Sequence, residues 1–429
     1  MTYFTSRKTL LAAAAAVAGL SNAAHADTTL GDLANLKVDT TIYGFLNGQL
    51  ESVQATGGAT PYNTRGRVSD GNSRLGFRGN IGVTDDLKGV WQLEASLNNF
   101  DQGGVNTRGE SSSLSSRNSY VGLESKRFGT FVVGNNDSVY RSLIGSGGEF
   151  GGNLGLTVHG MDVWNNTSAQ MTGNADSVFS RGEARYKNSA HYLSPAFAIP
   201  AAGSIQVGAS YGFDESQNSN TNRGRWSVAA RYDIGALSVG IGYDRQNNTG
   251  VDTDAMTQGF GFRTGDISGV NTSFAKVIAR YRFPTHTTVS VGFEQGKFGF
   301  EDEAIPTSTN YYPGVVRGTM KQNAAMISVA QDIGRASIMA SAGKLYDLKN
   351  TTFANQGDFG ATQYSIGALY NFNKYLAPYV YYTKIRNHAQ QSVNLGQSPV
   401  YSNNIGKDNA FLAPGDSPRA FGIGLIARF

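Results

Sequence analysis

The chain ends in the stretch RAFGIGLIARF, residues 419–429, in which two kinds of side chain alternate. One set, every second residue from Phe421 to Phe429, is wholly apolar, whereas the other is mostly small and ends in the charged Arg428. Successive side chains of a β-strand point to opposite faces. The stretch therefore predicts a strand with one apolar face, which needs an apolar partner, either a second sheet or lipid.

The same alternation recurs from one end of the chain to the other. In LSVGIGYD, residues 237–244, Leu, Val, Ile and Tyr fall on one face, and Ser, Gly, Gly and Asp fall on the other. Strict alternation with aromatic residues near the strand ends indicates strands rather than helices. The pattern predicts an all-β protein of sixteen strands, near residues 38–53, 73–82, 88–99, 114–125, 128–135, 181–195, 204–213, 223–234, 236–246, 271–283, 286–298, 319–332, 335–346, 361–372, 375–386 and 418–429.

The connections between these strands alternate in length. Short turns such as TDDLK (84–88) and DIGA (233–236) alternate with long polar connections, as at 136–180 and 387–417. A sheet that closes into a barrel pairs every backbone N–H and C=O between strands, which lipid requires. Barrels of the outer membrane have short periplasmic turns, long extracellular loops and about ten residues per strand. The sequence therefore predicts a sixteen-stranded antiparallel transmembrane β-barrel.

A soluble protein of two packed sheets is the alternative, because its strands also alternate. Such a protein buries its apolar faces in one core and does not need aromatic residues repeatedly at strand ends. We therefore favour the membrane barrel. The chain has no cysteine, which excludes a disulfide scaffold and a thiolate metal site in either case.

The first residues carry the pattern of a secretory leader. Two basic residues precede an apolar run from Leu10 to Leu20, and Ala24-His25-Ala26 is a cleavage site of small residues. The run is too short to cross a bilayer as a helix, which takes roughly 20 apolar residues. We expect a cleaved signal peptide over 1–26 and a barrel domain over 27–429. Without Arg7 and Lys8, 34 of the 36 basic residues remain against 32 acidic ones, and a balance of +2 does not favour a nucleic-acid binder.

Three longer stretches and the last residue carry a resemblance to a known family. The stretches are SRLGFRGNIGVTDDLKGVWQLE (73–94), SRNSYVGLESKRFGTFVVGNN (116–136) and RYKNSAHYLSP (185–195), and the last residue is Phe429. They resemble, in order, the second hairpin, the next hairpin and the strand after the third loop of the Gram-negative general porins of proteobacterial type. The resemblance covers essentially the whole mature chain.

The resemblance implies a homotrimeric channel in the outer membrane of a Gram-negative bacterium, surrounded by lipid and lipopolysaccharide. Small hydrophilic solutes and ions are expected to diffuse through it passively. It also implies a third loop, about 136–180, folded into the lumen as a constriction, and a Phe429 read by the barrel-assembly machinery. The family often has Arg where this chain has Asn135, so one positive site is missing. No cofactor or nucleic-acid partner is expected.

Strand alternation also predicts which charges face the lumen. Arg74 and Arg78 share one inward face, and Arg185 shares another with Lys187 and His191. Inward acids are fewer: Glu94, Glu183, Asp233, Asp244 and Glu294. The expected constriction sets a basic wall, Arg74, Arg78, Arg117 and Arg185, against acids of the third loop, Glu149 and Asp162. Because rings of charge set ion preference, four against two predicts a weak anion preference. The alternative is that these charges only solvate a wide lumen.

Several enzyme-like patterns lack their structural context. GASYG (208–212) fits G-x-S-x-G, but Ser210 falls mid-strand with no helix after it, so the nucleophile elbow is missing. EDE (301–303) and DTD (252–254) have carboxylates suited to Ca²⁺, although solvated loop charges are favoured and no metal site is expected. The sequence favours a diffusion channel and no enzyme. A substrate-selective channel of the same fold, and a barrel hydrolase or adhesin, remain as alternatives.

Overall fold

The computed structural model describes residues 38–71, 73–97, 114–145, 178–179, 181–215, 222–252, 263–266, 269–301, 317–350, 356–395, 399–401 and 412–429. The expected signal peptide, residues 1–26, lies outside this part of the chain. Residues 40–429 form one compact unit of strands. None of the described helices is long and apolar enough to cross a membrane.

Strands make up almost all of the regular structure in the described residues. The strands are β1 (Val38–Thr56), β2 (Tyr62–Asp70), β3 (Arg74–Gly82), β4 (Leu87–Leu97), β5 (Leu114–Ser125), β6 (Gly129–Asp137), β7 (Arg185–Leu193), β8 (Phe197–Ile199), β9 (Gly203–Gly212), β10 (Arg225–Ile234), β11 (Leu237–Gln246), β12 (Thr249–Asp252), β13 (Arg263–Asp266), β14 (Thr272–Arg282), β15 (Thr287–Glu301), β16 (Arg317–Ile333), β17 (Ala336–Leu345), β18 (Ala361–Tyr370), β19 (Leu376–Asn387) and β20 (Ser417–Arg428). A short helix, α3 (Val139–Ser142), follows β6, and a 3₁₀ turn, η1 (Gln356–Asp358), precedes β18.

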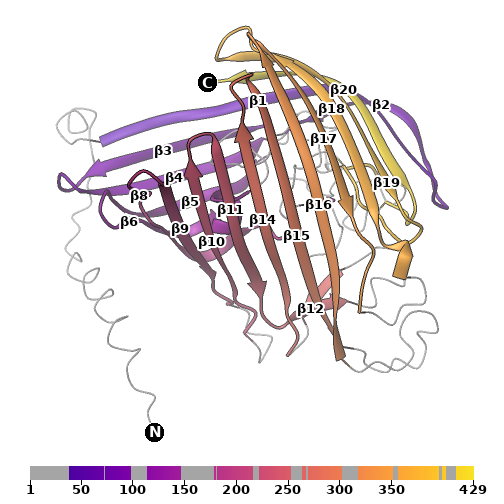
Figure 1. The fold of residues 1–429 in the computed structure, drawn as a ribbon, viewed down its shortest axis with the longest axis horizontal. Helices are drawn as coiled ribbons and strands as arrows, with labels where there is room; N and C mark the ends of the chain where they lie inside the picture. Colours follow the sequence, from indigo (N-terminus) through magenta and orange to yellow (C-terminus); the bar gives the residue numbers. More distant parts are fainter. Residues whose placement is uncertain are drawn as a thin grey trace. The chain divides into compact units, whose positions relative to one another are not determined.

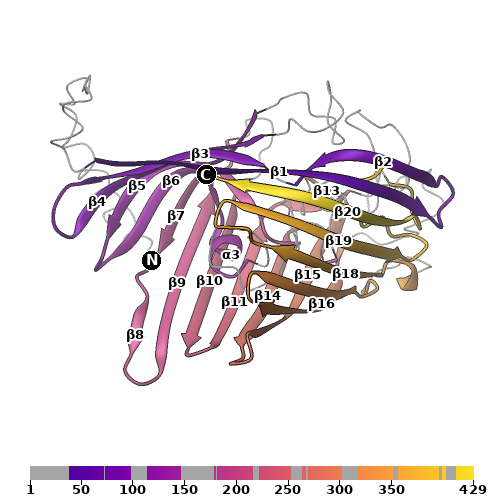
Figure 2. The ribbon, with the colours of Figure 1, turned by 90° about the horizontal axis from the view of Figure 1, so that it is seen from above.

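All the described strands except β12 and β13 form one closed antiparallel sheet. Successive strands pair side by side around it (Figure 1), and β20 pairs with β1 from Phe45 opposite Arg428 to Thr56 opposite Ser417 (Figure 2). Two positions in the ring are filled by two strands each: β2 and β3 both pair with β1, and β7 and β8 both pair with β9. The ring therefore has sixteen strand positions, which confirms the predicted barrel.

The terminal strand has the two faces that its sequence predicts. Ile423 is 56% exposed on the outer face, whereas Gly422 and Gly424 are buried on the inner face. The inner glycines are needed because tyrosine rings of β19 lie against them. A Cβ at Gly424 would lie 2.2 Å from Cζ of Tyr379, so only glycine fits there. The outer apolar face meets lipid, and the inner face is packed by side chains.

The structure differs from the sequence prediction in four places, one of which is the additional short strand β8 before β9. The second strand position begins with an additional strand, β2, before β3. At the junction of the two strands, the carboxylate of Asp70 accepts the N–H of Ser73 at 3.0 Å and interrupts the strand. The strand expected from residue 181 begins only at Arg185. The connection 247–270 contains a further hairpin, β12–β13, which forms a sheet of its own. Turn and loop hydrogen bonds of this kind do not alter the alternation of apolar and polar residues, so that alternation does not predict them.

The outer face gives a depth-dependent prediction on β18. Ile366, central on this strand, is 54% exposed, and Thr362 is on the same face four residues nearer the long-loop end. Arg on the lipid face costs ~2–4 kcal/mol at the midplane and ~0–1 kcal/mol near the interface. Ile366→Arg should therefore destabilise the folded barrel by ~2–4 kcal/mol and Thr362→Arg by ~1 kcal/mol or less, measured by reversible unfolding in lipid. Equal costs at both positions would contradict the assigned depths of the two residues in the membrane.

Candidate functional site

Two arginines of β3 lie on the inner face on either side of a tyrosine ring. The Arg74 guanidinium lies 4.8 Å from the centre of the Phe45 ring, and that of Arg78 lies 4.8 Å from the centre of the Tyr43 ring. Gly76, between the two arginines, makes room for Tyr43, because a Cβ there would lie 2.3 Å from Cζ of Tyr43. Cation–π contacts of this kind contribute about 0.5–1 kcal/mol at exposed sites and orient the cation. The R-L-G-F-R pattern thus holds both guanidinium groups on the inner wall.

Arg117 joins this wall through a β-bulge. In the β4–β5 pairing, Arg117 and Asn118 both oppose the single residue Glu94. The Arg117 Nε lies 2.6 Å from the Glu94 Oε1, and both side chains are nearly buried. The other oxygen, Oε2, accepts a hydrogen bond from the Tyr43 hydroxyl at 3.0 Å. Glu94 therefore ties Arg117 to the ring that Arg78 contacts.

Arg185 continues the same strip of contacts. Its Nε donates to Asn118 Oδ1 at 2.6 Å, and its Nη2 lies 3.0 Å from Asp137 Oδ1. Asp137 also pairs with Arg141, whose Nε lies 3.2 Å from the same oxygen, and accepts from Asn118 Nδ2 at 3.2 Å. The carboxylate at the end of β6 is thus shared by two arginines.

The structure brings the four predicted basic residues together on β3, β5 and β7. We call the group the lumen strip; it consists of Arg74, Arg78, Arg117, Arg141 and Arg185 with the acids Glu94 and Asp137. The predicted loop acids Glu149 and Asp162 lie outside the described residues. Sequence reasoning missed Asp137 and Arg141, although their i, i+4 spacing directly after a strand is a signal for an ion pair.

The alternation of side chains along β7 is interrupted once. Lys187 therefore does not share the buried inner face of His191, contrary to the prediction. Asn188 has a positive φ of 45°, and the β6–β7 register shifts opposite it. As a result Tyr186 and Ser189, three residues apart, are both buried, whereas Lys187 is exposed. A bulge adds one residue to a strand and so reverses the side-chain parity beyond it.

The described parts of the segment 136–180 pack on the inner wall from β7 to β15, next to the lumen strip. The helix α3 lies against β7, β9, β10 and β11 (Figure 2), and Tyr140, Ile144 and Phe179 are fully buried. Inward glycines receive these apolar side chains: Gly208 of β9 takes Val139, Gly242 of β11 takes Ile144, and Gly292 of β15 takes Phe179. The inward glycines of these strands therefore leave the space in which the segment packs.

Three buried ion pairs hold the end of this segment and the adjoining strands. The pairs are Lys276 with Glu183, Arg181 with Glu294 at 3.2 Å, and Arg225 with Asp244 at 2.8 Å. Arg181 also donates to Gln322 of β16 at 2.7 Å, and the Lys276 Nζ lies 4.3 Å from the centre of the Tyr140 ring. Since each of these three cations has a carboxylate partner, the three pairs together carry no net charge.

A serine and a histidine of the wall are close enough to suggest an enzyme. Ser210 Oγ lies 2.8 Å from Nδ1 of His191, whose Nε2 lies 2.7 Å from Ser189 Oγ. However, the same Ser210 oxygen accepts the Val139 N–H at 2.9 Å, and both side chains are buried beneath α3. The pair therefore fixes the start of the packed segment, and the buried hydroxyl is engaged by Val139 and His191.

The Lys276–Glu183 pair gives a stability prediction. Both side chains are essentially unexposed, so removing one partner leaves an uncompensated buried charge, which costs about 3–5 kcal/mol. Lys276→Met should therefore be strongly destabilised in denaturant unfolding, and adding Glu183→Met should recover much of the loss. Lys344→Met, on the exposed outer face, removes the same atoms and should change stability by less than about 0.5 kcal/mol. A single variant as stable as the control would show that the pair does not hold the segment.

Comparison with known proteins gives a consistent set of similarities. The profile of a family described as Gram-negative porin matches residues 11–390. An outer membrane porin protein of Bordetella pertussis is 26% identical over 411 residues, which cover 89% of this chain and 95% of that protein.

Solved structures with the same fold cover nearly the same part of the chain. An anion-selective porin from Comamonas acidovorans superposes with a TM-score of 0.62 at 18% identity, covering 91% of this chain and all of that one. OmpT of Vibrio cholerae, in a trimer form, gives 0.58 at 18% identity, covering 91% of this chain and 99% of that one. At this identity the likeness shows the fold alone.

Proposed function

Because this chain belongs to the Gram-negative porin family and forms an outer-membrane channel for passive diffusion, we propose that it weakly prefers anions. The observation that carries the proposal is the charge of the lumen strip, which has five guanidinium groups and two carboxylates. Charges that line a pore set ion preference. An excess of positive charge on one inner wall raises the local concentration of anions over that of cations.

The buried ion pairs of the neighbouring wall do not cancel this excess. Their three cations and three carboxylates are paired, so their fields largely offset one another. Charges farther away than the Debye length, ~8 Å at physiological salt, are screened in the aqueous lumen. The preference should therefore depend on the lumen strip and be strongest at low salt.

We also propose that the narrowest part of the pore lies between the lumen strip and the third loop, about 136–180. Glu149 and Asp162 would then bring acids from the loop side, which keeps the anion preference weak. The support is that both described ends of this loop, α3 and residues 178–179, contact the inner wall and not its rim. A segment tied to the wall at both ends reduces the cross-section beside it.

The test is the reversal potential across a KCl gradient in planar bilayers. The wild type should be anion-selective, and Arg74→Ser with Arg78→Ser should move its reversal potential towards zero, most clearly at low salt. Arg335→Ser with Lys374→Ser is the matched control, because it removes the same charge from two exposed turn residues. A cation-selective wild type would refute the proposal. If the wild type is anion-selective and the variant with Arg74→Ser and Arg78→Ser has the same reversal potential, the preference comes from other residues.

The family relation and the fold favour a channel over an enzyme. We propose that the channel has no catalytic activity, because the Ser210 hydroxyl and the His191 ring are both committed to holding α3. Purified wild-type channels should hydrolyse no ester substrate. Ester hydrolysis by the wild type that is lost in Ser210→Ala would contradict the proposal.

We further propose that Phe429 is an assembly signal read by the barrel-assembly machinery. It ends the closing strand, exchanges two backbone hydrogen bonds of 3.1 Å with Gly44, and has a ring that is 52% exposed. Deleting Phe429 should leave the protein in the periplasm with its leader cleaved. Phe372→Asp removes another aromatic side chain that is 52% exposed and should assemble normally. Normal amounts of heat-modifiable trimer after the deletion would contradict the proposal.

The expected partners include two further copies of this chain and the lipid of the outer leaflet. We propose a homotrimer, as in the trimer form of the Vibrio cholerae protein. For lipopolysaccharide the support is a belt of outward basic residues at the long-loop ends of strands: Arg245, Lys297, Lys321, Lys344, Lys384, Arg386 and Arg419. Among the described residues of β11, β14, β15 up to Lys297 and β16–β20, the outer face carries no Asp or Glu. Such a belt suits a leaflet of phosphorylated glycolipid.

The belt predicts how firmly lipopolysaccharide is retained. Replacing Lys344, Lys384 and Arg386 together by Ser should severalfold lower the lipopolysaccharide that co-purifies after detergent washing, since phosphate contacts are charge-assisted. A triple change of exposed basic residues at the turn end, Lys126, Arg335 and Lys374 to Ser, should leave it unchanged. Equal loss in both variants would show that the total charge matters and not the belt.

A further inference from the structure

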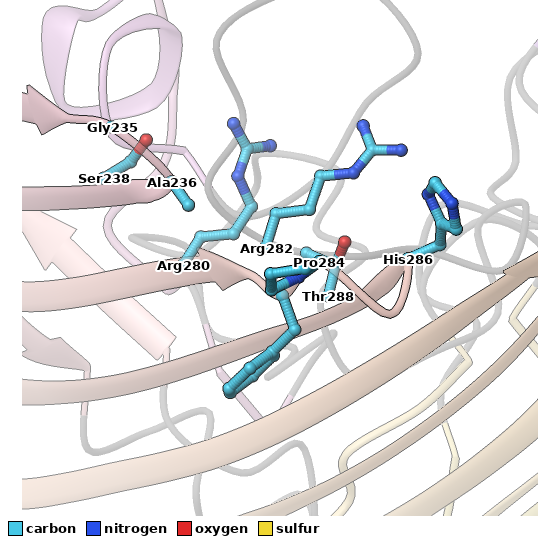
Figure 3. Close-up of a pocket in the computed structure, with 9 residues that line it drawn as sticks. Gly235, Ala236, Ser238, Arg280, Arg282, Pro284, His286 and Thr288 are labelled. Atoms are coloured by element: carbon cyan, nitrogen blue, oxygen red, sulfur yellow. The ribbon is translucent and has the colours of Figure 1, made fainter.

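We propose that a pocket at the periplasmic mouth of the channel binds a phosphate group, free or esterified on a small solute. The pocket has a volume of about 620 Å³ and lies beside the short turns β10–β11 and β14–β15 (Figure 3). Short turns are at the periplasmic end of such barrels. The residues that carry the argument are Arg280, Arg282, Ser238, Thr288 and His286, and we call them the mouth pocket.

The mouth pocket presents two guanidinium groups side by side. Arg280 and Arg282 are two residues apart on β14, so their side chains leave the same face of the strand. Figure 3 shows both guanidinium groups extending in the same direction from this strand. The register sets a hydroxyl residue across from each: Ser238 opposes Arg280, and Thr288 opposes Arg282. The two guanidinium groups and the Thr288 hydroxyl are donors of the kind that a phosphate accepts from, whereas the Ser238 hydroxyl donates to Asp233.

The cations around the pocket outnumber the acids, because Arg231, Arg280 and Arg282 face only Asp233 and Asp332 among the described residues of these strands. Asp233 forms a double contact with Arg231, at 2.9 and 3.0 Å, accepts a hydrogen bond from Ser238, and also interacts electrostatically with Arg280. Asp332 lies 3.6 Å from Arg282, but the two side chains are 41% and 61% exposed. Exposed pairs of this kind contribute about 0–1 kcal/mol. A dianion can therefore displace Asp332 from Arg282 at little cost.

Phosphate matches this arrangement better than a monovalent anion does. Like charges two residues apart on one face repel each other, and a ligand with two negative oxygens relieves that repulsion for both arginines at once. The planar fork of arginine suits the paired oxygens of phosphate. The volume falls in the range of about 300–1,000 Å³ of small-molecule pockets, which leaves space for an organic group behind the phosphate.

The mouth pocket is separate from the lumen strip, which is built on β3–β7. It would hold an anion at the periplasmic end, next to the exit from the narrow part of the pore. Its occupancy depends on the channel being open but not on the proposed anion preference.

The test is saturable inhibition of the chloride current in planar bilayers at constant ionic strength. Inorganic phosphate added on the periplasmic side should lower the wild-type current to a plateau. The half-saturating concentration should rise about tenfold or more in Arg280→Ser with Arg282→Ser, the loss expected for about 1.4 kcal/mol of contacts. Glycerol phosphate is the second probe; saturation by one of the two probes identifies the source of the phosphate group, and saturation by both supports a site for the group itself.

The matched control is again Arg335→Ser with Lys374→Ser, which removes two charges from neighbouring periplasmic turns. It should keep the wild-type half-saturating concentration. The proposal is overturned if neither probe saturates, if the Arg280 and Arg282 variant saturates as the wild type does, or if the control loses saturation equally. Heat-modifiable trimer in every variant verifies folding. The KCl reversal potential, measured in the same bilayers without phosphate, reports separately on the anion preference.

Discussion

The pairing of the last strand with the first is the constraint on which the rest of the structure depends. Lipid offers no partner to a backbone N–H or C=O, and an unpaired group there costs several kcal/mol. The twelve residue pairs from Phe45–Arg428 to Thr56–Ser417 remove the only two edges that a linear order of strands would have. Closure in turn fixes an outer and an inner face for every strand. Each side chain is thereby assigned to lipid or to the lumen.

The inner face solves a second problem, which is how to hold charges in a narrow space. On the lumen strip, Glu94 and Asp137 are shared among arginines of neighbouring strands, so each guanidinium is oriented without being neutralised as a group. On the neighbouring wall, Arg181, Arg225 and Lys276 each have a buried carboxylate partner, and these pairs hold the end of the third loop. The same residue types therefore have two roles. The ratio of bases to acids and the degree of burial decide which role a residue has.

The sequence predicted the parts of this arrangement that follow from a period of two. The outer face of residues 419–429 and the inward direction of Arg74 and Arg78 were both confirmed, since no bulge interrupts either strand. The alternation predicted the wrong face for some residues where the strand register shifts. The bulge at Arg117 and Asn118 and the positive φ of Asn188 depend on local backbone geometry, which hydrophobic alternation does not encode. The packing of Val139 on Gly208 joins residues far apart in sequence, and neither stretch of sequence indicates which residue it will contact.

A channel for passive diffusion requires that the sixteen strand positions enclose an open, water-filled passage. Single-channel recording of the purified protein in planar bilayers measures this passage. The recordings should show stepwise openings of uniform size with a linear current–voltage relation, and a conductance that rises with the bulk conductivity of the salt. Folded, heat-modifiable protein that inserts into the bilayer and passes no current would contradict it.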